Sequence, residues 1–70
     1  METEIYESDP FTAKKQDLLV TIESDYRFQK GDELYLQKGG GRQIKVRVID
    51  VRLHVDEAGR MRREILALKV

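Results

Sequence analysis

The chain has no cysteine, no tryptophan, one proline and one histidine among its 70 residues. Without cysteine, neither disulfide bonds nor a thiolate metal site can stabilise the fold, and the cytoplasm is the expected compartment. The single histidine is His54, and the serines, Ser8 and Ser24, lie in polar segments without a positioned base. We therefore expect no enzyme, no metal site and no cofactor.

Long hydrophobic runs are also missing. Residues 1 to 20 carry acidic side chains at Glu2, Glu4, Glu7, Asp9 and Asp17. This pattern predicts neither a secretory signal nor a membrane-spanning segment. The length fits a single domain, residues 1 to 70, and a domain near this size buries only about 60% of the surface that its unfolded chain exposes. Its core is therefore thin, and assembly with a second chain is one way to add stability.

The formal net charge is zero, but the charges are unevenly distributed. Residues 1 to 37 contain nine acidic and four basic side chains, whereas residues 38 to 70 contain four acidic and nine basic ones. This asymmetry is typical of a nucleic-acid surface or a steered protein contact. Acidic and basic strands that lie side by side in one small sheet would give the same distribution.

What the sequence does contain is the signal of a long β-hairpin between Arg42 and Val70. Asp56 to Gly59 fits a type I turn, with Asp at its first position and Gly at its last. A loop of residues 57 to 59 then fixes the register of the two strands. The predicted pairs are Asp56 with Arg60, Val55 with Met61, His54 with Arg62, Arg52 with Glu64, and Val51 with Ile65.

The apolar residues of this hairpin change face halfway along it. Near the turn, one face carries Ile49, Val51, Leu53, Val55, Met61, Ile65 and Ala67. Toward the base, the opposite face carries Ile44, Val46, Val48, Leu66, Leu68 and Val70. We interpret this as both strands switching their buried face together.

The end of the chain also permits a helix, because Ala58, Met61, Ile65 and Leu68 lie near one helical face and good helix formers surround them. A strand is favoured by the turn chemistry and the matched charge pairs, and because Gly59 is a mediocre helix start.

Three shorter strands precede the hairpin, at Thr3 to Tyr6, Leu18 to Ile22 and Glu33 to Gln37. A helical turn is expected near Pro10, capped by Ser8 or Asp9. The predicted fold class is all-β: a small, twisted, five-stranded barrel or open barrel with one short helical turn and a long C-terminal hairpin.

Basic residues mark a candidate nucleic-acid surface at the base of the hairpin. Lys45, Arg47 and Lys69 are expected on its exposed face, with Arg47 directly opposite Lys69. The segment Gly39 to Arg42 either offers backbone amides and a guanidinium to a phosphate or is a flexible connection. Tyr35 is the aromatic residue predicted to point outward and stack on a base.

The imidazole of His54 falls on the charged face of the hairpin with Asp50, Arg52 and Asp56. It is either a proton switch or weak metal ligand, or an ordinary exposed strand histidine.

The run YRFQKGDELYL followed by GRQIKVRVIDV, residues 26 to 51, resembles the turn and strands of PUA-like small barrels, including the ASCH group. The matching positions are Phe28, Gly31, Asp32 and the Leu34/Leu36 alternation, which SH3-like barrels share equally. The resemblance implies RNA or modified nucleotides as ligands. The charged signature that precedes this turn in ASCH sequences is absent, so only the turn is carried over: Gly31 for its backbone freedom and Asp32 for a bond from side chain to backbone.

Two functions follow from these patterns, and neither is catalytic. The first is protein interaction or self-assembly, as a homodimer or with another protein, through the apolar face of the distal hairpin. That face comprises Val51, Leu53, Val55, Met61 and Ile65. The alternative is an RNA-binding module that uses Lys45, Arg47, Lys69, Arg42 and Tyr35.

Overall fold

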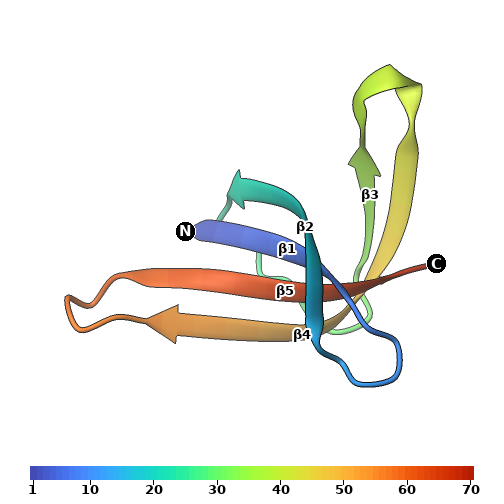
Figure 1. Ribbon diagram of the computed structural model, residues 1–70. Helices are drawn as coiled ribbons and strands as arrows, with labels where there is room; N and C mark the ends of the chain where they lie inside the picture. Colours follow the sequence, from blue (N-terminus) through green and yellow to red (C-terminus); the bar gives the residue numbers. More distant parts are fainter.

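The computed structural model describes residues 1–70 as one five-stranded sheet curled into an open half-barrel (Figure 1). The strands are β1 (Glu2–Ser8), β2 (Lys15–Glu23), β3 (Glu33–Gln37), β4 (Gln43–Val55) and β5 (Met61–Lys69). Their order across the sheet is β2-β1-β5-β4-β3, with β1 and β5 parallel and all other neighbours antiparallel. The predicted fold class is confirmed, and the segment that also permitted a helix is strand β5.

The β4–β5 turn forms as its sequence predicts. The amide of Asp56 donates to the carbonyl of Arg60 (3.0 Å), and the amide of Gly59 donates to the carbonyl of Asp56 (3.0 Å). The Asp56 carboxylate accepts from the amides of Ala58 (2.9 Å) and Arg60 (3.0 Å), while Gly59 has a φ of 81°. The register that this turn sets pairs Val55 with Met61 and continues as predicted to Val51 and Ile65.

Further from the turn, the prediction that both strands change face together is wrong. The register shifts between Val48 and Asp50, which leaves Ile49 as an extra residue in β4 alone. Such a bulge moves the following side chains of one strand to the other face, while its partner keeps an unbroken alternation. Arg47 is consequently opposite Leu68 rather than Lys69.

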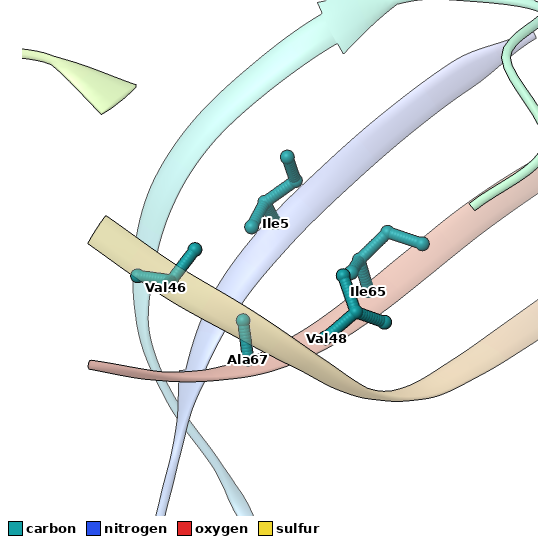
Figure 2. Packing of buried hydrophobic residues seen from close by; sticks show 5 residues of the cluster. All are labelled: Ile5, Val46, Val48, Ile65 and Ala67. Carbon is teal, nitrogen blue, oxygen red and sulfur yellow. The ribbon is translucent and has the colours of Figure 1, made fainter. Parts of the chain in front are cut away.

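The core therefore combines residues that the sequence pattern had assigned to opposite faces. Figure 2 shows five side chains from β1, β4 and β5 packed together on one side of the sheet. They are Ile5, Val46, Val48, Ile65 and Ala67, each at most 1% exposed. Partly buried side chains from β2, β3 and the β2–β3 loop surround this cluster, Phe28 among them. Because β5 lies at the centre of the sheet, Leu66 is buried on its other face.

The helical turn predicted near Pro10 does not form. Residues 10 to 12 make a simple turn in which the Asp9 carboxylate accepts from the amides of Phe11 (2.8 Å) and Thr12 (2.9 Å). The short helical turn is a 3-10 turn at Gly39–Gly41, where Gly40 has a φ of 75°. No helix of the chain is long and apolar enough to cross a bilayer.

The turn before β3 also forms as expected. Gly31 has a φ of 93° and donates its amide to the carbonyl of Val48 (2.8 Å). The carboxylate of Asp32 accepts from the amide of Gln29 (3.0 Å), which is the predicted bond from side chain to backbone. This turn fastens the start of β3 to β4 at Val48, just before the bulge.

Candidate interaction surface

The end of the β4–β5 hairpin, residues 53 to 61, carries a stripe of exposed apolar side chains; we call this segment the hairpin tip. Leu53 is 57% exposed, Val55 62% and Met61 45%. Side chains alternate along a strand, so these residues share the face of Val51 and Ile65. The apolar stripe thus continues the core face past the point where the core ends.

The core ends there because no further element covers this face. In β1, Glu2 is opposite Arg62, so the strand reaches no further toward the turn than that position. Figure 1 shows the tip projecting past the N-terminus of the chain.

Arg63 closes the core at this boundary. Its side chain is buried at 7% exposure and donates to the Thr3 hydroxyl (3.0 Å) and to the backbone carbonyls of Ser24 (2.7 Å) and Tyr26. Its guanidinium also lies 5.1 Å from the centre of the Phe28 ring. A buried cation is tolerated when its donors are paired, and here they fasten the β2–β3 loop over the core.

The outer edge of β4 is open along the same segment. Strand β3 pairs with β4 only from Gln43 to Arg47, and the last bonds on this edge join Val48 to the turn that precedes β3. Beyond Val48, β4 pairs with β5 alone. Because the Asp56–Arg60 bond marks a hydrogen-bonded pair, alternation turns the amide and carbonyl of Val51, Leu53 and Val55 outward.

One of these outward amides already has a partner. The Asp50 carboxylate accepts from the amide of Val51 at 3.0 Å. The backbone groups left for another strand are therefore those of Leu53 and Val55, on the same residues that expose apolar side chains.

The opposite face of the hairpin is charged and centred on Glu64. This carboxylate has a side-chain exposure of 5% and contacts Lys15 (2.8 Å), His54 (2.9 Å) and Arg62 (3.2 Å). The hydrogen bond from Lys15, helped by those from His54 and Arg62, lowers the pKa of Glu64 to about 2, although burial opposes this shift. Arg62 also reaches Glu4 at 2.8 Å. The cluster is internally neutralised, which is typical of a structural ion-pair network.

A shallow depression of about 360 Å³ lies beside the tip, between the turn and the start of β1. Its lining is mostly charged: Glu2, His54, Val55, Asp56, Arg60, Met61 and Arg62. No group of three or more histidine, aspartate or glutamate side chains is arranged to hold a metal ion.

The residues predicted to bind nucleic acid are only partly brought together. Tyr35 is 59% exposed on β3 and opposite Lys45, whose ammonium lies 5.7 Å from the centre of the ring. Lys69 is opposite the core residue Val46, so the register directs it to the other face of the sheet from Lys45 and Arg47. Arg42 is exposed after the glycine turn.

Carboxylates of the same chain neutralise most of these cations. Glu33 lies 3.0 Å from Lys45 and 3.6 Å from Arg47, and Glu7 lies 3.6 Å from Lys69. The hydrogen bond between Glu33 and Lys45 lowers the pKa of the carboxyl and raises the pKa of the amine. The acidic and basic halves of the chain thus pair with each other in the sheet.

Among the predicted interface residues, Leu53, Val55 and Met61 are exposed together, Val51 is half-buried and Ile65 is fully buried in the core. Sequence reasoning missed the buried pair Arg63 and Glu64. The alternation that placed Met61 and Ile65 on the core face also places Arg63 there, so its position was readable. The sequence did not reveal Lys15 as the partner of Glu64, because the two lie 49 positions apart in the chain.

Comparison of the chain with protein-family models, with curated proteins and with solved structures gave no match in any of the three.

Proposed function

We propose that this chain is a small, non-catalytic interaction domain that binds another protein chain through the hairpin tip. One observation carries the proposal: Leu53, Val55 and Met61 are exposed on one face of the hairpin tip, where the outer edge of β4 has no neighbouring strand. Exposed apolar side chains are ordinary when scattered singly. Here they coincide with unpaired backbone groups, which are what an added β-strand uses for affinity and specificity.

Burial would be favourable for each of these side chains. Fully burying an aliphatic side chain of this size stabilises by about 1.5 to 3 kcal/mol relative to leaving it in water. The alternating polar residues Arg52 and His54 keep the other face of the edge polar, which limits the apolar contact to one face. A partner strand that is apolar on one face fits this edge.

The test is photo-crosslinking from a single position in the cells that naturally make the protein. A photoreactive residue at Val55 should give a defined adduct with another protein chain. The adduct should disappear when Leu53→Lys is added. The matched control is the same photoreactive residue at Leu18, which is 50% exposed on β2. Absence of an adduct at Val55, or equal adducts at both positions, would remove the proposal.

Nucleic-acid binding is the alternative, and its support is the basic half of the chain. The pairing of Lys45 and Arg47 with Glu33, and of Lys69 with Glu7, weighs against it, because a phosphate would have to displace these carboxylates. Labelled single-stranded RNA and duplex DNA titrated at low and physiological salt test it. Binding that is lost when Lys45, Arg47 and Lys69 are all changed to Glu would favour this function over the first.

The resemblance of residues 26 to 51 to PUA-like barrels is proposed for the turn alone. Phe28 against the core, the positive φ of Gly31 and the Asp32 bond support it. We propose no ligand from this resemblance. A cytoplasmic location likewise stays a proposal, resting on the absence of cysteine.

A further inference from the structure

The open edge of β4 is complementary to itself. We propose that the occupant of the hairpin tip is a second copy of this chain, joined by antiparallel pairing of the two β4 edges about a two-fold axis at His54. This inference rests on the proposed function and specifies the partner. A two-fold contact requires one surface to match its own copy, so the residues that the pairing brings opposite each other must be compatible.

The backbone groups fit this axis. With the axis at His54, Leu53 of one copy lies opposite Val55 of the other, and this pair recurs by symmetry. Both residues turn their amide and carbonyl outward, so each pair exchanges two backbone hydrogen bonds. The amide of Val51, which Asp50 already occupies, is not needed.

The side chains on either side of the axis fit it on both faces, and His54 meets its own copy on the axis. On the apolar face, Leu53 meets Val55 of the second copy, with Met61 directly beside Val55. On the charged face, Arg52 meets Asp56 of the second copy. Arg52 uses only Nε in its bond to Asp50, and Asp56 uses only Oδ1 in the turn, so both have polar atoms free for this pair.

The registers nearer the bulge fit less well. An axis at Leu53 places Asp50 opposite Asp56 of the second copy, and an axis at Arg52 places that guanidinium opposite itself. Like charges directly opposite destabilise a sheet. Both registers also use the backbone of Val51, whose amide is occupied. An axis between two residues would pair each apolar residue of β4 with a residue from the charged face of the second copy.

Space and size are consistent with a loose dimer. Figure 1 shows the tip projecting past the rest of the chain, and the strand order places β1 and β2 on the far side of β5 from this edge. The apolar contact consists of three side chains per copy. Interfaces well below about 1,200 Å² of total buried area are generally transient, so the dimer should be weak and dependent on concentration.

Single cysteines test the register, because the natural chain has none. Opposite residues that do not share hydrogen bonds have Cα atoms about 4.5 Å apart, a separation that a disulfide spans. Under mild oxidation at high protein concentration, His54→Cys should form a covalent dimer much faster than Arg52→Cys or Leu53→Cys. Leu18→Cys, on another edge strand and similarly exposed, measures random collision.

Sedimentation equilibrium of the cysteine-free chain is the independent measurement. The wild type should show association that rises with concentration, Leu53→Lys should abolish it, and Leu18→Lys should not. Faster cross-linking of Arg52→Cys or Leu53→Cys than of His54→Cys would overturn the register. Monomers at all concentrations, with no β4 cysteine faster than Leu18→Cys, would overturn the second copy as occupant. In that case, an adduct of different mass at Val55 would leave the proposed function standing, and no adduct would remove both.

Discussion

Glu64 shows how a single side chain can make the stability of this fold depend on pH. Its carboxylate is nearly enclosed and receives hydrogen bonds from three basic side chains. Those bonds form with the ionised carboxylate, so the folded state holds the proton much less tightly than the unfolded chain does.

The expected consequence is acid sensitivity in a defined range. The pKa of Glu64 is 4.5 in the unfolded reference and about 2 in the fold. The stabilisation is therefore complete above pH 4.5 and is lost as pH falls from 4.5 toward 2. This contribution to the free energy of unfolding is at most about 3 kcal/mol. Denaturant unfolding of the wild type and Glu64→Gln across this range measures it: the difference between the two should shrink with falling pH. A constant difference would contradict the assignment.

Gly59 is the second residue with a clear individual role. Its φ is 81°, and a Cβ placed there would meet no atom within 4 Å. The cost of Gly59→Val is therefore conformational, about 1 to 3 kcal/mol of unfolding free energy, because a β-branched residue is poorly accommodated at positive φ. Gly59→Asn should lose less, and Gly39→Val, in equally open space without positive φ, should change little. Equal losses at both glycines, measured by thermal unfolding, would argue against this role for the turn.

At the scale of the element, the two parts of β4 have different surroundings. Gln43 to Arg47 pairs with β3, pairing with β5 begins at Val46, and after the bulge at Ile49 β4 pairs with β5 alone. The bulge brings Val46 and Val48 onto the same face as Ile65 while leaving the tip register intact. The same apolar pattern is core at the base and surface at the tip.

This difference predicts that substitution by aspartate lowers the free energy of unfolding far more at the base of this face than at the tip. Ile65→Asp buries an unpaired charge in the core and should cost several kcal/mol, comparable with the whole stability of a small domain. Leu53→Asp at the exposed tip should change the free energy of unfolding by less than about 1 kcal/mol. Circular dichroism melts at low protein concentration compare them. Similar losses would mean that the tip is packed within the chain.

At the scale of the whole molecule, an open half-barrel depends on side chains to close it. Lys38, just after β3, donates to the carbonyl of Leu19 on β2 (2.9 Å), which links the two edge strands. Arg63 fastens the β2–β3 loop over one end of the core. These contacts connect parts of the chain that no backbone pairing joins.

Removing the second of these contacts should loosen the loop before the sheet. Arg63→Ala leaves the carbonyls of Ser24 and Tyr26 and the Thr3 hydroxyl without the guanidinium donors and should cost about 2 to 3 kcal/mol. Amide hydrogen exchange of residues 24 to 32 should accelerate more than that of β4 and β5. Arg60→Ala, an exposed turn arginine, is the control. Unchanged exchange in the loop would show that Arg63 does not hold it.

The sequence by itself determined the features that depend on neighbouring residues. The Asp56–Gly59 turn, the register of the tip and the strand alternation of β3 all follow from local backbone preferences and a period of two. The apolar stripe that forms the candidate interaction surface was visible for the same reason, and so was its end at the turn.

Only the tertiary structure decided where these strands go and which side chains meet. The parallel pairing of β1 with β5 joins residues about as far apart as the chain allows, and it brings Lys15 to Glu64 and Thr3 to Arg63. No local preference encodes such contacts, because they form only when several strands bury a common face. The bulge at Ile49 belongs to the same class: the apolar pattern showed a change of face, but the packing of Val46 and Val48 against Ile65 decided which strand makes it.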